Sequence, residues 1–302
     1  MSAPWVRRFL VHGVFWRRLL RFGVLYMPLW AEPFVVGTWA LIFLLWGPGR
    51  RGVMRNLTAI LPGSNALGNF MRTYRVFCNF AWTISDNVRF QELRVGPDWD
   101  FEGMEHFREL EAREGGAIIL TAHMGSYDLG AQLFAEVSQR QIVMVRAPET
   151  DPETQRYEKE WTDRTIGAGL KIDFSTRASA LALDLLHSLQ RGEIIAIQGD
   201  RVTPGISALP ATLFGKPARL PAGPFALAMA ARVPIYPLFI MRIGRRHYRL
   251  VVGKPIEVVR TRDRSEAFEL AVAQWSRELE SVIHRAWFQW FTFQPYSEEL
   301  AA

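Results

Sequence analysis

Cysteine is almost absent from this chain of 302 residues. Because Cys78 is the only one, the chain cannot form an intramolecular disulfide. We therefore expect a reducing compartment, or a membrane face turned towards one. Cys78 lies in the aromatic segment Phe77–Trp82 with no histidine nearby in sequence. Core packing is accordingly the favoured interpretation of this thiol, ahead of nucleophilic catalysis.

Lysine is also scarce, and nearly all of the basic residues are arginine, although the formal net charge is +6. Arginine forks suit phosphate and carboxylate groups. A basic chain can bind nucleic acid, an anionic membrane surface or an acidic protein. No zinc-finger spacing, RNA-recognition signature or lysine-rich tail is present. We therefore expect no nucleic acid partner.

Metal-ligand spacings are missing as well. There is no H-E-x-x-H pattern and no pair of cysteines, and His187, His247 and His284 each stand alone in the sequence. We expect neither a catalytic metal nor another cofactor.

The chain has no long uninterrupted apolar run. Its most apolar part, Phe22–Trp46, is broken by Pro28 and Pro33 and carries one carboxylate, Glu32. The unbroken portion, Phe34–Trp46, would extend only about 20 Å as a helix, less than the ~30 Å of a bilayer core. This length favours a broken, interface-lying or re-entrant anchor over a transmembrane helix. The alternative is a hydrophobic helical hairpin packed on the domain.

Arginines flank this apolar stretch on both sides, which under the positive-inside rule places both ends on the cytoplasmic side. The sequence thus predicts a membrane-associated segment over residues 1–50 and a catalytic domain over residues 51–302. A signal peptide is disfavoured because no small-residue cleavage site follows the apolar run.

Beyond residue 50 the chain alternates apolar runs with helical patterns. Several of the runs are continuously apolar, as in strands covered on both faces. This alternation predicts an α/β fold, with a mostly parallel central sheet and helices on both faces. The predicted strands are 117–122, 141–146, 170–173, 194–198, 235–241 and 248–252. The predicted helices are 51–61, 69–91, 126–138, 154–167, 178–191, 221–231 and 264–287.

The first of the core strands runs directly into His123, and Asp128 follows five positions later. On one helix that spacing would place the two side chains about 140° apart, so His123 must lie in the turn before the helix. Gly125 makes such a turn sterically easy, and the amide groups of the helix start can bind an anion. We therefore expect His123 and Asp128 to meet across the turn as a general base and its orienting carboxylate.

Further polar residues follow other predicted strands. Arg146 ends one strand, and Asp200 and Arg201 follow another. Carboxyl ends of parallel strands share one edge of a sheet, which favours a pocket there. Arg146 can instead pair with Glu149, and Asp200 with Arg201, as local contacts.

Together these motifs resemble the H-x4-D/E glycerolipid acyltransferases, in the branch of the late, acyl-carrier-protein-dependent lipid A biosynthesis acyltransferases. The resemblance covers roughly residues 30 to 290. The ordered blocks that carry it are 51–62, 116–123, 123–128, 198–201, 213–218 and 221–228.

This resemblance implies an enzyme of the inner membrane, at its cytoplasmic face, that moves a fatty acyl group from a thioester to a hydroxyl of a lipid or glycolipid. The donor would be acyl-carrier protein, whose acidic surface suits the arginines, or acyl-CoA. Asp200 and Arg201 would line the site. Arg201 is a candidate to contact the oxyanion or a phosphate, and Arg146 is a second candidate for a phosphate. The blocks containing Phe214 and Gly223 would shape an acyl groove, with simple loop packing as the alternative.

The aromatic segment Trp287–Gln294 departs from the basic pattern of lipid A acyltransferases and suggests contact with the membrane interface. It leaves open an acyltransferase of a pigment or other lipid pathway. A thioesterase or hydrolase using the same residues, and a silent membrane scaffold, are the remaining alternatives.

Overall fold

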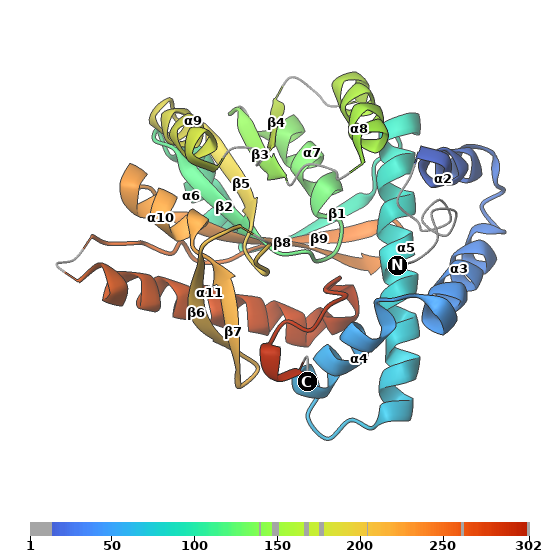
Figure 1. Cartoon of the computed structure of the whole chain (residues 1–302). Coiled ribbons are helices and arrows are strands. Elements are labelled where there is room, and N and C mark those ends of the chain that lie inside the picture. Colours follow the sequence, from blue (N-terminus) through green and yellow to red (C-terminus); the bar gives the residue numbers. More distant parts are fainter. Residues whose placement is uncertain are drawn as a thin grey trace.

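The computed structural model describes residues 14–138, 140–146, 151–165, 169–174, 178–203, 205–260 and 263–300. Within these ranges the chain forms one seven-stranded sheet, a separate two-stranded hairpin and surrounding helices (Figure 1).

The main sheet is mostly parallel, as predicted. All neighbouring strands run parallel except β8 and β9, which form an antiparallel pair. In order across the sheet, the strands are β1 (Asp98–Glu102), β9 (His247–Val252), β8 (Ile235–Gly244), β2 (Ala117–Thr121), β5 (Ile194–Gln198), β3 (Ile142–Arg146) and β4 (Leu170–Phe174).

Helices cover both faces of the sheet because its central strands are apolar on both sides. In β2, Ile118 and Leu120 point into one core, and Ile119 points into the other. The first core contains α9 (Ala178–Gln190), α10 (Gly223–Ala231) and α11 (Arg264–Ala286). The second contains α5 (Ala66–Leu93), α6 (Met104–Ala112) and α7 (Tyr127–Val137). Helix α8 (Pro152–Thr165) follows β3, and two short 3-10 helices occupy Trp287–Gln289 and Glu298–Leu300.

Three strands were not expected from the sequence. β1 is an edge strand rich in charged residues, so it lacks the apolar run of a central strand. β6 (Ala208–Leu213) and β7 (Lys216–Pro221) form the antiparallel hairpin, which packs against α11 (Figure 1). Prolines at both strands obscured the pattern, since proline removes a ladder donor.

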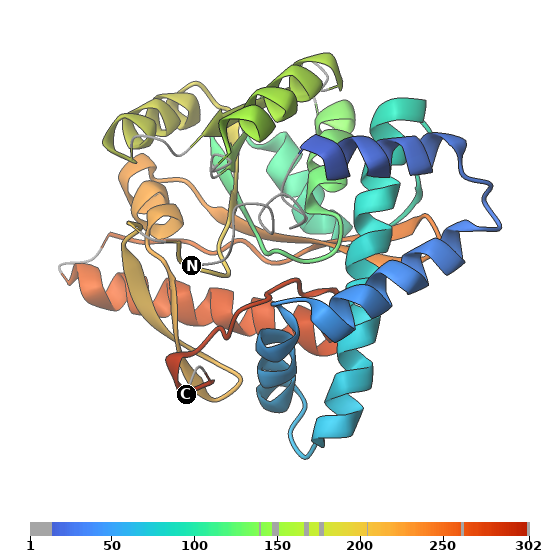
Figure 2. The ribbon, with the colours of Figure 1, turned by 45° about the vertical axis from the view of Figure 1, so that its right-hand side comes forward.

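The N-terminal helices lie outside the sheet, along the long helix α5. They are α2 (Val14–Tyr26), α3 (Glu32–Trp46) and α4 (Arg50–Ile60) (Figure 2). Among the described residues, no helix combines the length and the apolar character needed to cross a bilayer. One face of α3 is buried against the protein through Val36, Ala40 and Leu44, while the opposite face is exposed and apolar.

A buried carboxylate fastens the start of α3 to the sheet domain. Glu32 is fully buried and accepts a hydrogen bond from Ser85 on α5 at 2.9 Å. Arg245 and Arg246, in the turn between β8 and β9, each place a guanidinium nitrogen 3.1 Å from Glu32. Although burial raises the pKa of Glu32, these hydrogen bonds and the nearby arginine charges lower it below its ordinary value. Glu32 is therefore an ionised anchor for the N-terminal helices.

The aromatic C-terminal segment is part of the protein interior. Trp290 and Phe291 are only 3% and 4% exposed, and Gln289 is 1% exposed. Asn56 of α4 donates hydrogen bonds to the carbonyl oxygens of Thr292 and Gln294, at 3.0 and 2.9 Å. The expectation that this part of the segment lies in the membrane interface is therefore wrong, because its rings fill the space between the helices and the sheet.

Candidate active site

His123 lies two residues beyond the end of β2, in a turn that leads into α7. Gly125 makes this turn possible: its φ is +55°, and a Cβ there would lie 1.6 Å from the carbonyl oxygen of Ile240. The turn is held by the C-terminal segment, since Phe291 N–H donates to the carbonyl oxygen of His123 at 2.8 Å. The prediction that His123 precedes the helix carrying Asp128 is confirmed.

Asp200 occupies the equivalent position after the neighbouring strand. The parallel register pairs Thr121 of β2 with Gln198 of β5, so His123 and Asp200 each lie two residues past the paired ends. Oδ1 of Asp200 is 2.7 Å from Nδ1 of His123. The sheet thus brings together two residues that are 77 positions apart in the sequence.

Asp200 is buried but fully hydrogen-bonded. Its second carboxylate oxygen accepts a hydrogen bond from Nε1 of Trp290 at 2.9 Å. Burial raises the pKa of Asp200, but the charge of His123, the hydrogen bonds from His123 and Trp290, and the charge of Arg201 lower it to about 2. Asp200 is therefore a carboxylate at neutral pH, able only to accept hydrogen bonds.

Asp128 forms neither a hydrogen bond nor an ion pair with His123, and the expected pairing across the turn requires correction. Asp128 is the second residue of α7, and its carboxylate is bound by the guanidinium of Arg146 at the end of β3. The helix start turns Asp128 towards β3, whereas Nδ1 of His123 faces β5 and Asp200. The alternative local partner of Arg146, Glu149, lies outside the described residues.

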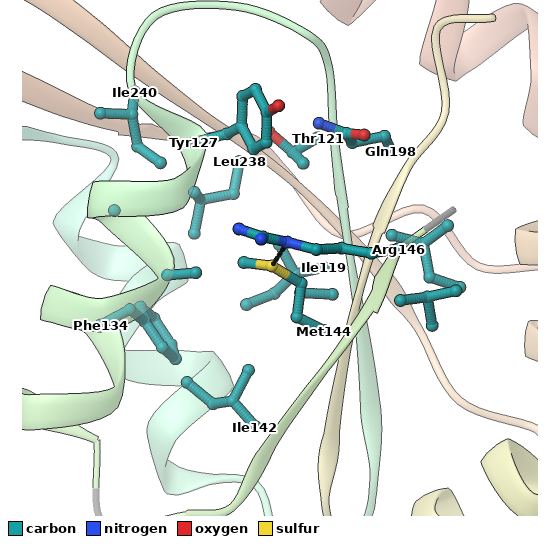
Figure 3. Close-up of a pocket in the computed structure, with 15 residues that line it drawn as sticks. Ile119, Thr121, Tyr127, Phe134, Ile142, Met144, Arg146, Gln198, Leu238 and Ile240 are labelled. Atoms are coloured by element: carbon teal, nitrogen blue, oxygen red, sulfur yellow. Dashed lines mark hydrogen bonds between the residues drawn. The ribbon is translucent and has the colours of Figure 1, made fainter. Parts of the chain in front are cut away.

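A mostly apolar cavity opens beside this site, between α7 and the sheet (Figure 3). About 530 Å³ of empty space lies between its walls when the solvent at its open mouth is included. The ring of Tyr127 lines the cavity and meets the ring of His123 edge to face, with centroids 5.8 Å apart. Apolar side chains such as Phe134 and Ile142 line the other end (Figure 3).

The remaining predicted site residues lie in different places. Arg201 is exposed next to Asp200, and its charge contributes to the low pKa of that carboxyl group. Phe214 lies at the turn between β6 and β7 and packs against Trp290, with ring centroids 6.3 Å apart. Gly223 is exposed at the start of α10. Neither Phe214 nor Gly223 lines the cavity between α7 and the sheet.

Trp290 is the site residue that sequence reasoning missed. The aromatic C-terminal segment is evident in the sequence, but nothing in its pattern indicates that one indole reaches a carboxylate 90 positions away. The sequence does not indicate the cavity under α7 either. The residues of α7 that line it form an apolar helix face, and such a face is also what ordinary core packing predicts.

The arrangement suits the removal of a proton from a substrate. An ionised, buried carboxylate at Nδ1 holds the imidazole in the tautomer whose Nε2 is free to accept a proton. Among the described residues, no cluster of three or more histidine, cysteine, aspartate or glutamate side chains could hold a metal ion.

Comparison with known families agrees with this chemistry. A search among curated proteins found no match. The family model described as bacterial lipid A biosynthesis acyltransferase matches residues 9–296, nearly the whole chain. The chain therefore belongs to the bacterial lipid A biosynthesis acyltransferases, and it is an acyltransferase.

Proposed function

We propose that this enzyme transfers a fatty acyl group from an acyl thioester to a hydroxyl of a lipid A precursor or related glycolipid, with His123 as the general base. The observation that carries the proposal is the contact between Nδ1 of His123 and the buried carboxylate of Asp200. It combines a base of suitable chemistry with the carboxylate that orients it.

The bond changes follow from this geometry. Nε2 of His123 takes the proton of the acceptor hydroxyl as its oxygen attacks the thioester carbonyl carbon. Asp200 accepts the hydrogen bond from Nδ1 and stabilises the positive imidazolium. The tetrahedral intermediate then collapses, the carbon–sulfur bond breaks, and the leaving thiolate takes the proton back from His123. The ester forms and the base is restored without a cofactor.

The cavity between α7 and the sheet is the proposed site of the acyl chain. Its apolar walls suit a hydrocarbon, and its position next to Tyr127 puts one end near His123. The negative charge of Asp128, together with burial, raises the pKa of Tyr127 to about 12. Tyr127 therefore keeps its hydroxyl proton at neutral pH and can donate a hydrogen bond to a polar group of the donor at this end.

Arg146 also lines the cavity, and its partner Asp128 follows Tyr127 directly in α7. We assign Arg146 the binding of a phosphate, either on the lipid acceptor or on the phosphopantetheine arm of the donor. Acyl-carrier protein is the proposed donor, since the net charge of +6 suits an acidic partner. Acyl-CoA is the alternative donor, and its activity should be compared with that of the acyl-carrier-protein thioester.

We also propose that the N-terminal helices bind the surface of the inner membrane from the cytoplasmic side. Large apolar side chains are exposed at the turn between α2 and α3 and along the outer face of α3, among them Tyr26, Trp30 and Phe34, each more than 70% exposed. Arginines of α2 and α4 lie on either side of these positions in the sequence. Apolar side chains flanked by arginine are typical of helices that lie in the interface of an anionic membrane.

The function is tested with purified enzyme, lipid A precursor in detergent, and either acyl-carrier-protein or CoA thioesters. Mass spectrometry should show a product heavier than the acceptor by one acyl group. The variant His123→Ala should lose this product, whereas His187→Ala, at an exposed position on α9, should retain it. Release of free fatty acid with no acylated lipid would instead indicate a thioesterase. Full transfer by folded His123→Ala would refute the proposed base.

A further inference from the structure

We infer that Trp290 is a positioning residue for the reaction, and that the short C-terminal segment Gln289–Phe291 is part of the catalytic apparatus. This inference rests on the proposed function of His123. It adds a residue from the far end of the chain, which acts through Asp200 and does not touch the reacting atoms.

The indole of Trp290 completes the coordination of Asp200. One carboxylate oxygen contacts His123 at 2.7 Å, and the other accepts the indole N–H at 2.9 Å. Asp200 is only 2% exposed and Trp290 only 3%. If the indole N–H were removed, a buried charged oxygen would lose its donor, and the carboxylate would be free to rotate away from His123.

A second indole fixes the backbone at the same turn. Nε1 of Trp275, on α11, donates to the carbonyl oxygen of Gly199 at 3.0 Å. Gly199 itself packs against Leu120, where a Cβ would lie 2.5 Å from a side-chain carbon. The backbone of the Asp200 turn is therefore held by α11 and β2, and Trp290 is left to set the direction of the carboxylate.

The segment Gln289–Phe291 also pairs with the turn that carries His123. Gly125 N–H donates to the carbonyl oxygen of Gln289 at 3.0 Å, and Phe291 N–H donates to that of His123 at 2.8 Å. Trp290 lies between these two bonds, in an antiparallel bridge with Met124. One short segment thus contacts His123 through its backbone and Asp200 through its side chain.

Hydrogen bonds to β8 and contacts with two further aromatic rings hold the segment in place. The side-chain amide of Gln289 makes two hydrogen bonds with the backbone of Arg242 in β8, at 2.6 and 2.8 Å. Phe214 and Tyr296 pack against the indole of Trp290, with ring centroids at 6.3 and 5.6 Å. These contacts make the position of the indole N–H a fixed feature of the fold.

The direct test is Trp290→Phe, which keeps an aromatic ring but removes the donor. Trp287→Phe, two residues before this segment and with no hydrogen bond from its indole nitrogen among the described residues, is the matched control. We expect kcat to fall about 10-fold in Trp290→Phe, with KM within about twofold and the control unchanged. The acid limb of its pH–rate profile should move to lower pH, because a carboxylate that can rotate away from His123 stabilises the protonated imidazole less.

Two comparisons make this test decisive. In an Asp200→Asn background, Trp290→Phe should cause no further loss of kcat, since its effect acts through the carboxylate. If folded Trp290→Phe keeps the wild-type kcat and pH profile while His123→Ala is inactive, the role of Trp290 is wrong and the proposed function of His123 stands. Full activity of His123→Ala would instead overturn the proposed function.

A measurement on the wild-type enzyme covers the case in which Trp290→Phe does not fold. With 15N-labelled tryptophan, one of the 11 indole N–H resonances should shift along the acid limb of the pH–rate profile, and this shift should vanish in His123→Ala. If no indole resonance follows that limb, the inference is wrong.

Discussion

Oδ1 of Asp200 lies 2.7 Å from Nδ1 of His123, although the histidine and the aspartate of the H-x4-D pattern are only five positions apart. The carboxylate that orients the imidazole therefore comes from the neighbouring strand β5. Asp128, the nearer acid in sequence, pairs with Arg146 instead. The site therefore contains two separate pairs, His123 with Asp200 and Arg146 with Asp128.

Because of Asp200, the free energy of unfolding should depend on pH in the acid range. Its pKa in the folded protein is about 2, below the ordinary value of 3.8. The stabilisation is therefore fully present above about pH 5 and is lost progressively as the pH falls through about 2. It should amount to about 2 kcal/mol. Denaturant unfolding at pH 7 and pH 2.5 should show a smaller loss of stability in Asp200→Asn than in the wild type. Equal losses of stability in the two proteins would show that the Asp200 carboxylate is not the source of this stabilisation.

The cavity between α7 and the sheet should set the length of the acyl chain. Ala131 of α7 lines it, so Ala131→Phe should fill part of the space. We expect this variant to transfer short acyl chains at nearly the wild-type rate and to lose most of its activity with long ones. The assay is competition between thioesters of different length, read by mass spectrometry. Ala112→Phe, at an exposed position on α6, is the control. An unchanged length profile in Ala131→Phe would exclude this cavity as the acyl site.

Glu32 should be a major anchor of the N-terminal helices. Glu32→Ala would leave Arg245 and Arg246 without the carboxylate that both contact. We expect a loss of about 3 kcal/mol in the free energy of unfolding, measured by denaturant titration. Glu105→Ala, where the glutamate side chain is 74% exposed, should change stability by less than about 0.5 kcal/mol. Similar stability of the two variants would show that the buried contact contributes little.

The turn between α2 and α3 should drive membrane binding. In Trp30→Ser/Phe34→Ser, two highly exposed apolar side chains are lost while the buried face of α3 is kept. Sedimentation with phosphatidylglycerol vesicles should show weaker binding than for the wild type. The control is Leu183→Ser, at a 59% exposed position on α9, which should bind like the wild type. Equal binding of all three proteins would place the membrane contact elsewhere.

The sequence predicted the sheet well because parallel strands buried on both faces are continuous apolar runs, as in Ile194–Gln198. It failed at β1, an edge strand with three acidic residues among its five. It also failed at the β6 and β7 hairpin, where prolines break the pattern. In the described part of the chain no helix is long and apolar enough to cross a bilayer, and the membrane contact of the N-terminal segment remains a prediction.

The site was only partly predictable for a geometric reason. His123, Arg146 and Asp200 were each expected at the carboxyl end of a strand, and the structure places them there. Strand order, however, is not contained in local patterns, so nothing indicated that β5 would lie directly beside β2. Proximity in sequence therefore favoured Asp128 as the partner of His123. Trp290 was unpredictable for the same reason, since it approaches Asp200 only through the packing of the C-terminal segment.

The most direct test is the single-turnover rate of acyl transfer in His123→Ala, Asp200→Asn and the double variant, each confirmed to be folded. Residues that act as one unit show strongly non-additive losses. We predict that Asp200→Asn lowers the rate by at least about 100-fold, and that adding it to His123→Ala causes no further loss. A wild-type rate in folded Asp200→Asn would contradict the account.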